Sequence, residues 1–232
     1  TSFIILLISI FLGILSVSPT ISSQFFANLC GKLTQSNELN PLRCGLVSNI
    51  NGRVLEFGFG PGTNFRCWTN NSNIVEWVGV DPNIHFNDLV LKQKENYNIT
   101  FSTNIVWLEG ENVNVEEQSF DYVIATHTLC SVNDVNQVLK QISRALKPGG
   151  KYLFFEHVTA PTNSHLYYLQ LLMSPFLKIV GNGCQFRELW KNINSSNEPS
   201  SPFFGYDVKI EHINAPISLP PLTPHIIGEV NK

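Results

Sequence analysis

The sequence predicts an α/β fold in which helices cover both faces of a mostly parallel sheet. Two observations support this prediction. Short apolar segments suited to buried strands alternate with longer segments suited to helices, and three glycines at alternate positions directly follow the first strand. Apolar strands that alternate with helices are typical of a parallel sheet buried on both faces. The chain has 232 residues, 43% of them hydrophobic, which is enough for one domain with a full core.

The elements follow one another in a regular order. Strands are expected at residues 53–57, 74–81, 101–108, 120–126 and 151–158, and two closing strands at residues 203–213 and 225–230. Helices are expected to begin at residue 63 and to occupy residues 83–96 and 134–146. The last helix is amphipathic, and the Lys-Pro-Gly-Gly sequence that follows it is a stop signal. Its apolar face consists of Val135, Val138, Leu139, Ile142 and Leu146.

The first 22 residues differ from the rest because they carry no charge, and residues 3–17 are almost entirely apolar. This run is shorter than the ~20 residues that a simple membrane span needs. A membrane anchor, a cleaved signal peptide and a core helix are the three interpretations. We expect an anchor, because a core helix would show a polar face and a signal peptide would show a basic flank.

Charge and cysteine content exclude some classes of function. The net charge is −3, whereas proteins that bind nucleic acid carry a basic face, so we expect no nucleic-acid partner. The number of cysteines is odd and no two form a Cys-x-x-Cys pair. We therefore expect reduced thiols rather than a disulfide framework or a zinc site, and no metal. The cysteines are Cys30, Cys44, Cys67, Cys130 and Cys184.

The glycine run after the first strand is the first candidate for a binding site. Gly58, Gly60 and Gly62 follow Glu56, and Asp81 ends the next strand. Ligands of such sheets bind at the carboxyl ends of the strands, where glycines let the backbone approach them closely. The third glycine is not where a dinucleotide fingerprint requires it. Because a carboxylate at Asp81 can accept hydrogen bonds from a ribose, the expected ligand is a nucleoside without a pyrophosphate.

The motifs taken together resemble those of the class I S-adenosylmethionine-dependent methyltransferases. They are the acid and glycine run, the acid of the second strand, "FDYVIAT" at residues 120–126 and "LKPGG" at residues 146–150. The resemblance covers residues 53–158 and implies a Rossmann-like fold with a seven-stranded, mostly parallel sheet. The positions that it assigns to the cofactor are Glu56, Gly58, Phe59, Gly60, Gly62, Asp81, Pro82, Glu109, Gly110, Glu111, Thr126 and His127.

The resemblance also implies a role for each part of this set. The glycine loop would wrap the methionine part of the cofactor, and Glu56 would orient that loop through its backbone and through the cofactor ammonium group. Asp81 would hold the ribose with Pro82 against the adenine, whereas residues 109–111 would contact the adenine edge. Thr126 and His127 would line the pocket of the methyl donor.

A narrower resemblance extends over nearly the whole chain. The sequence is similar to the methyltransferase-like 7 family of membrane-anchored alkyl thiol methyltransferases, which also begin with an apolar segment and lie on the endoplasmic reticulum or lipid droplets. Two positions depart from that family, because Phe59 and Pro61 stand where cysteine and threonine are more usual. The motifs that carry the resemblance are "THTLCSV" (126–132), "FEHV" (155–158), "GCQFRELW" (183–190), "HINAP" (212–216) and "PHIIG" (224–228).

The chemistry of a thiol acceptor points to two histidines. A thiol reacts as its thiolate, and an ordinary thiol with a pKa of ~8.5 is largely protonated at neutral pH. His127 follows the fourth strand and His157 ends the fifth, so either is a candidate base. The alternative is that the sulfonium charge stabilises the thiolate and no base is required. Cys130 is expected to be structural, because direct transfer needs no covalent intermediate. The apolar residues 166–180 are expected to cover the cofactor cleft and to line an apolar acceptor site, or else to form a core helix.

These observations lead to one expected function and two alternatives. We expect methyl transfer from S-adenosylmethionine to a small lipophilic thiol. Methylation of an isoprenoid quinone or another lipid, and a non-catalytic protein with the same fold, are the alternatives. The expected organisation is an anchor at residues 1–22, a helical lead-in at 23–52 and a catalytic domain at 53–232. That domain is expected to face the cytosol at the endoplasmic reticulum or a lipid droplet.

Overall fold

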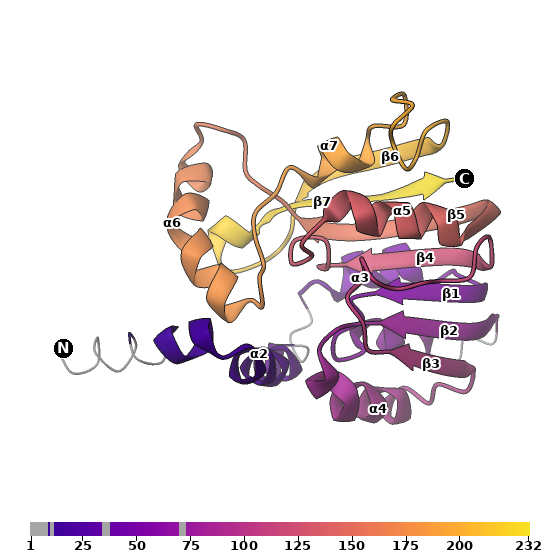
Figure 1. Ribbon diagram of the computed structural model, residues 1–232, viewed down its shortest axis with the longest axis horizontal. Helices are drawn as coiled ribbons and strands as arrows, with labels where there is room; N and C mark the ends of the chain where they lie inside the picture. Colours follow the sequence, from indigo (N-terminus) through magenta and orange to yellow (C-terminus); the bar gives the residue numbers. More distant parts are fainter. Residues whose placement is uncertain (1–8, 10–11, 34–37, 70–72) are drawn as a thin grey trace.

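The computed structural model describes residues 9, 12–33, 38–69 and 73–232. These residues form a seven-stranded sheet with the strand order β3-β2-β1-β4-β5-β7-β6 (Figure 1). The first five strands are parallel, whereas β7 is antiparallel to both β5 and β6. The strands are β1 (Gly52–Phe57), β2 (Ile74–Val80), β3 (Ser102–Val106), β4 (Phe120–Thr126), β5 (Leu146–His157), β6 (Asp207–Asn214) and β7 (Pro224–Asn231). The predicted α/β fold and the existence of the seven strands are confirmed. Two boundaries are wrong: β6 begins at Asp207 rather than at residue 203, and Leu146 and the Lys-Pro-Gly-Gly sequence belong to β5 rather than to the end of the preceding helix.

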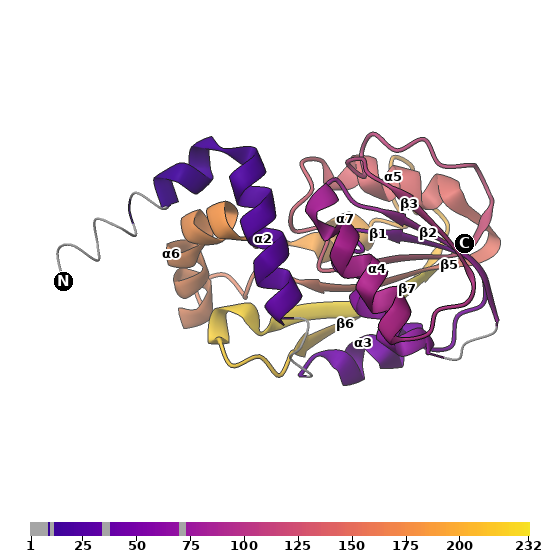
Figure 2. The same cartoon turned by 90° about the horizontal axis from the view of Figure 1, so that it is seen from below.

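Helices lie on both faces of the sheet (Figures 1 and 2). One core contains the buried residues of α5 and α7, and the other contains buried residues of α2, α3, α4 and the 3₁₀-helix η1. Because both faces are covered, the central strands are buried on both sides, as their unbroken apolar sequences predict. The helices are α2 (Pro19–Leu33), α3 (Asn40–Val47), α4 (Asn87–Asn96), α5 (Val135–Ala145), α6 (His165–Val180) and α7 (Leu189–Ile193). Three short 3₁₀-helices join them, η1 (Thr63–Trp68), η2 (Ile84–Phe86) and η3 (Pro220–Leu222).

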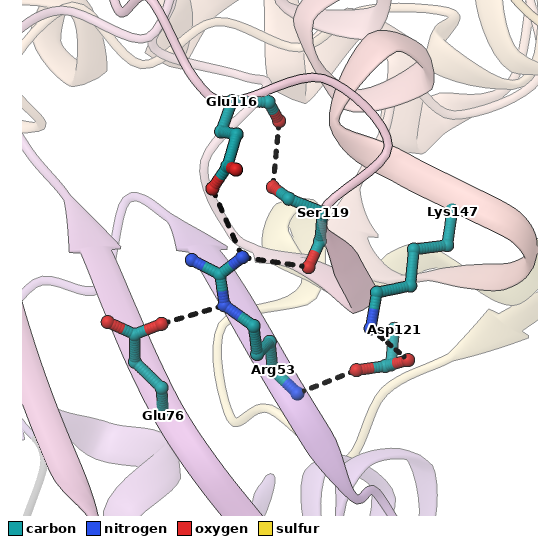
Figure 3. A network of polar contacts seen from close by, with 6 residues as sticks. All are labelled: Arg53, Glu76, Glu116, Ser119, Asp121 and Lys147. Carbon is teal, nitrogen blue, oxygen red and sulfur yellow. Dashed lines mark hydrogen bonds and ion pairs between the residues drawn. The ribbon is translucent and has the colours of Figure 1, made fainter.

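Polar side chains tie the amino ends of the parallel strands together. Arg53 of β1 donates from Nε to Glu76 of β2 at 2.8 Å, and its backbone N–H donates to Asp121 of β4 at 2.8 Å (Figure 3). Lys147 of β5 donates to the same Asp121 at 2.8 Å, and Glu116 also accepts from Arg53 at 3.1 Å. This network therefore stabilises the amino ends of the strands, opposite the glycine loop. The loops that form the site lie at the carboxyl ends.

The apolar helix α6 is not a core helix. Only Gln170 and Val180 of this helix are buried, whereas Leu172 is 78% exposed. The helix stands to one side of the sheet and lies next to the start of α2 (Figure 1), to which a hydrogen bond from Ser22 to the Ile179 carbonyl joins it. Its apolar composition therefore reflects an exposed apolar surface, and periodicity alone could not distinguish this from burial.

Part of the expected anchor lies outside the described residues, which begin at residue 9 and omit residues 10–11. Helix α2 begins at Pro19 and therefore crosses the expected boundary between residues 22 and 23. Among the residues described, no helix has both the length and the apolar character needed to cross a membrane.

Cys44 and Cys67 form a disulfide, so the expectation of reduced thiols is wrong for this pair. Cys44 lies on α3 and Cys67 on η1, and their Cα atoms are 5.0 Å apart. The two elements pack closely, since Trp68 of η1 donates from its indole N–H to the Val47 carbonyl of α3 at 2.8 Å. The disulfide joins cysteines that are 23 positions apart, a spacing that does not by itself indicate a bond.

Replacing both Cys44 and Cys67 by serine is expected to lower the free energy of unfolding by about 3 kcal/mol, because the bond restricts the unfolded chain. Urea unfolding of the oxidised protein measures the loss. Wild type in reductant should unfold at the midpoint of the double variant, and Cys30→Ser, which removes a free thiol, should keep the oxidised midpoint. Equal midpoints with and without reductant would show that the bond is absent or without effect.

Candidate active site

The loop between β1 and η1 has a conformation that favours glycine. Gly58, Gly60 and Gly62 have φ angles of 63°, 53° and 80°, in the left-handed region. A Cβ atom on Gly58 would lie 2.2 Å from the hydroxyl of Thr128, so glycine is required there. A Cβ on Gly60 would meet only Phe86, at 3.9 Å, so this part of the backbone has room for a ligand. The alternate glycines therefore form a tight left-handed loop that has open space at Gly60.

Phe59 contributes to this loop through its backbone. Its side chain is buried and packs edge-on against Trp77 and Trp107, with ring centroids 5.5 and 5.4 Å away. The expected α-helix after the loop is instead η1, a 3₁₀-helix of six residues.

Glu56 lies beneath the loop and is almost completely buried. One carboxylate oxygen accepts from the Asn64 amide at 2.7 Å, and the other accepts from the Trp77 indole at 2.8 Å. Burial raises the pKa of Glu56 to about 7, although these two hydrogen bonds oppose the shift. The carboxylate thus positions the loop through two side chains, whereas backbone contacts were expected.

Asp81 joins the loop to the end of β2. Its carboxylate oxygens accept from the backbone N–H of Gly60 at 3.0 Å and of Asn83 at 2.9 Å. Burial raises its pKa to about 6 in spite of both bonds. Each oxygen keeps a second lone pair, so the carboxylate can still accept from two ribose hydroxyls. Pro82, which follows it, is exposed.

The acids after β3 have separate environments. Glu111 is buried, and one of its oxygens accepts from the backbone N–H of Asn133 at 2.6 Å and of Asp134 at 3.1 Å. It therefore holds the start of α5. Glu109 is exposed and accepts from Asn112 at 3.0 Å, so its carboxylate stays accessible. Gly110 is buried against Phe57, which a Cβ would approach to 3.1 Å. The predicted adenine contacts of residues 109–111 stay a prediction.

Arg43 is a site residue that sequence reasoning missed. Its buried guanidinium donates to Thr126 Oγ1 at 2.7 Å, to Asn64 Oδ1 at 3.2 Å and to His127 Nδ1 at 3.2 Å. Burial lowers its pKa to about 10, and Glu56 opposes that shift. Within the described part of the chain, no carboxylate forms an ion pair with it, and its Nε has no partner. A single arginine in an apolar stretch has no spacing signal that would identify it.

His127 lies at the centre of a chain of hydrogen bonds. It has a left-handed φ of 55°, a conformation that is uncommon for residues other than glycine. Since Arg43 donates to Nδ1, Nε2 carries the proton and donates to His225 Nε2 at 2.9 Å. His225 in turn donates from Nδ1 to the Thr223 carbonyl at 3.0 Å. Burial, and then the charge of Arg43, hold the pKa of His127 well below its usual value. Both nitrogens are engaged, so the base role of His127 stays a prediction.

His157, the other candidate base, faces two cysteines. Its Nε2 is 3.0 Å from Cys184 Sγ, and Cys130 Sγ belongs to the same cluster. Its Nδ1 is buried without a partner in the described part of the protein. The cluster was missed because its members are 27 residues apart and lie in three separate segments.

The arrangement fits S-adenosylmethionine. Arg43 provides a buried cation without an ion-pair partner among the described residues, which suits the carboxylate of the cofactor. Asp81 suits the ribose, and the glycine loop leaves space where a ligand must approach the backbone. The positive charge of Arg43 is thus complementary to the carboxylate at the methionine end of the cofactor, and the carboxylate of Asp81 is complementary to the ribose hydroxyls.

Known proteins share this fold. The family described as "Methyltransferase domain" matches residues 55–154. A solved structure of a SAM-dependent methyltransferase from Thermotoga maritima, described as a possible histamine N-methyltransferase, superposes with a TM-score of 0.63 at 17% identity. The superposition covers 93% of this chain and 100% of that one, and at this identity it shows the fold alone. Fold and site together define a class I S-adenosylmethionine-dependent methyltransferase.

The relatives are more specific. The human thiol S-methyltransferase TMT1A is 33% identical over 182 residues, which cover 77% of this chain and 70% of the relative. The rat thiol S-methyltransferase TMT1B is 34% identical over 182 residues, with the same coverage of both chains. The chain therefore belongs to the family of the thiol S-methyltransferases TMT1A and TMT1B.

Replacing Asp81 by alanine is expected to weaken cofactor binding up to about a hundredfold, because the loss of hydrogen bonds costs ~1–3 kcal/mol. Calorimetric titration with S-adenosylmethionine measures the change. The affinity of wild type should also fall as the pH drops through about 6, where the carboxylate gains a proton, and the variant should lack this step.

Two controls separate binding from folding. Asp88→Ala removes an exposed acid of α4 and should leave the affinity unchanged. Thermal unfolding shows whether Asp81→Ala keeps its fold, because the carboxylate also bonds Gly60 and Asn83. A folded variant with wild-type affinity contradicts the ribose assignment.

Proposed function

We propose that this methyltransferase transfers a methyl group from S-adenosylmethionine to the sulfur of small lipophilic thiols. One observation carries the proposal. The similarity to relatives named thiol S-methyltransferases spans 182 residues, well beyond the methyltransferase domain at residues 55–154. All methyltransferases of this class share the cofactor-binding domain. The segments outside that domain differ between enzymes with different acceptors. Similarity in those segments therefore supports the same acceptor chemistry.

When bound, S-adenosylmethionine supplies a methyl group that its sulfonium charge makes electrophilic. The residues of this chain bind and orient the reactants. Arg43 would hold the carboxylate of the cofactor and Asp81 its ribose, and the glycine loop, which Asp81 binds at Gly60, would lie against the cofactor. Thr126 ends β4 and His127 follows it, next to the loop, where the acceptor would have to approach in line with the bond that breaks.

The alternatives are less well supported. A quinone or another lipid acceptor would use the same cofactor groups, but no contact among the described residues favours it over a thiol. A non-catalytic role would not require Glu56, Asp81 and Arg43 to be buried around an open glycine loop. Burial of three charged groups is costly, and a bound cofactor with complementary groups offsets that cost.

The expected activity is methylation of alkyl thiols in preference to quinones, phenols and amines. Labelled S-adenosylmethionine and a panel of matched lipophilic acceptors measure it, with the folded Asp81→Ala variant as the blank. A chain of equal length that carries a hydroxyl in place of the thiol is the matched control acceptor. Faster labelling of a quinone than of every thiol would overturn the thiol assignment.

We also propose that the N-terminal segment anchors the protein to the endoplasmic reticulum or a lipid droplet, with the catalytic domain in the cytosol. Residues 1–22 carry no charge, and Val17 is 79% exposed. The exposed apolar residues of α6 lie at the same end of the molecule as the start of α2 (Figure 1). They include Tyr168, Leu169, Leu171, Leu172 and Phe176. Such a surface would receive lipophilic acceptors from a bilayer.

The full-length protein expressed in cells should stay in the membrane fraction after alkaline extraction, and removal of residues 1–17 should release it. The glycosylation sequons at Asn98 and Asn194 lie at exposed residues, and the sequon at Asn70 lies outside the described residues. All three should stay bare if the domain faces the cytosol. A glycosidase-sensitive mass, or a mature chain without residues 3–17, would contradict the proposed orientation. This test matters because disulfides such as Cys44–Cys67 are rare in the cytosol.

A further inference from the structure

Three side chains from separate segments meet beside the carboxyl ends of β4 and β5. Cys130 lies in the loop after β4, His157 ends β5, and Cys184 lies in the turn after α6. The two sulfurs and one imidazole nitrogen all lie within 4.8 Å of one another. We propose that these side chains bind one Zn²⁺ ion, whose fourth coordination position receives the acceptor thiol. The second part of this proposal rests on the proposed function.

The loops that carry the two cysteines are tied to each other. The backbone N–H of Gln185 donates to the Cys130 carbonyl at 3.0 Å, and Arg187 donates from its side chain to the Val132 carbonyl at 2.7 Å. The Thr159 N–H, just after β5, donates to the Arg187 carbonyl at 3.1 Å. Backbone bonds thus hold all three segments together, so the three donor atoms are positioned before any ion binds.

The spacing of the donor atoms suits zinc. Zinc–sulfur and zinc–nitrogen bonds of about 2.3 and 2.0 Å place tetrahedral ligands roughly 3.4–3.8 Å apart. That range lies between the 3.0 Å contact of His157 Nε2 with Cys184 Sγ and the 4.8 Å limit of the cluster. Thiolate and imidazole donors favour zinc over magnesium or calcium, which prefer oxygen. Three protein ligands, rather than four, are typical of a zinc site with an open position.

The position of the cluster suits acceptor binding. In the sheet, β4 lies between β1 and β5, so the cluster is one strand away from the glycine loop. Thr128, two residues before Cys130, donates from its hydroxyl to the Phe57 carbonyl at the root of that loop, at 3.0 Å. Cys130 and His157 are buried, whereas Cys184 is partly exposed and leaves one side accessible.

A zinc ion would solve the problem of thiol ionisation, for which His127 has no free nitrogen. The acceptor thiol would release its proton to solvent on binding the metal as a thiolate. The same sulfur would then form a bond to the methyl carbon while the bond between that carbon and the sulfonium sulfur breaks. The products are a methyl thioether and S-adenosylhomocysteine, both neutral at sulfur, and no oxidant or reductant is consumed.

The second ring nitrogen of His157 affects the affinity of the cluster for zinc. With Nε2 on the metal, His157 carries its proton on Nδ1, which has no hydrogen-bond acceptor among the described residues. Loss of such an outer hydrogen bond typically weakens metal binding about 10–100-fold. Zinc is therefore expected to bind reversibly, and purification without chelators or reconstitution with zinc is needed to observe it.

Elemental analysis of the full-length protein, purified without chelator or reconstituted with zinc and desalted, should find about one zinc per chain. Cys130→Ser and Cys184→Ser should each reduce it at least tenfold, whereas Cys30→Ser, which removes the remaining free cysteine, should retain it. Cys184→His keeps a suitable ligand and should restore binding. Circular dichroism and S-adenosylmethionine affinity show that each variant is folded.

Cobalt tests the open position in the wild-type protein. Co²⁺ in the site should give the intense visible absorption of a tetrahedral ion, and hexanethiol without cofactor should increase the sulfur-to-cobalt charge-transfer band. Wild type that stays metal-free after reconstitution, or that contains a Cys130–Cys184 disulfide in its active form, overturns the site. Thiol methylation by zinc-free protein overturns the site's catalytic role alone, whereas bound zinc without thiol methylation overturns the proposed function instead.

Discussion

The guanidinium of Arg43 is the group on which the candidate site most depends. It donates hydrogen bonds to Asn64 of η1, Thr126 of β4 and His127. Asn64 in turn donates to Glu56 of β1. Elements that are distant in the sequence are thus joined by one buried network. Loss of one member leaves a buried polar group unpaired, at a cost of ~1–3 kcal/mol for each such group. The geometry of the site is therefore a property of the whole network rather than of the glycine loop alone.

The charges of this network also explain why acids can remain buried beside it. Burial raises the pKa of Glu56 to about 7 and that of Asp81 to about 6. Arg43 opposes the shift at Glu56. The ammonium and sulfonium groups of a bound cofactor would add positive charge to the same region. Cofactor binding should thus favour the ionised form of both acids. The charges of the protein and of the cofactor are thus complementary. A sequence motif shows the residues separately and does not show how their charges interact.

The sequence predicted features whose cause is local. The strands, the amphipathic face of α5 and the glycine loop follow from periodicity and from backbone conformation, and all are present. It did not predict Arg43, the Cys44–Cys67 bond or the cluster around His157, because each depends on segments that only the folded chain brings together. It assigned α6 to a cleft or a core because an apolar helix has the same composition whether its partner is protein, substrate or lipid. Burial distinguishes these environments, and composition does not.

The five cysteines divide into groups with different chemistry. Cys44 and Cys67 are oxidised, whereas Cys130 and Cys184 stay free although their sulfurs lie within 4.8 Å. Conditions that maintain the first pair as a disulfide also favour oxidation of the second, since both are pairs of neighbouring thiols. Coordination by zinc would resolve this conflict, because two sulfurs that are each bonded to one ion are not free to pair as a disulfide. The proposed ion would therefore have two effects: it would activate the acceptor sulfur and protect the two sulfurs of the protein.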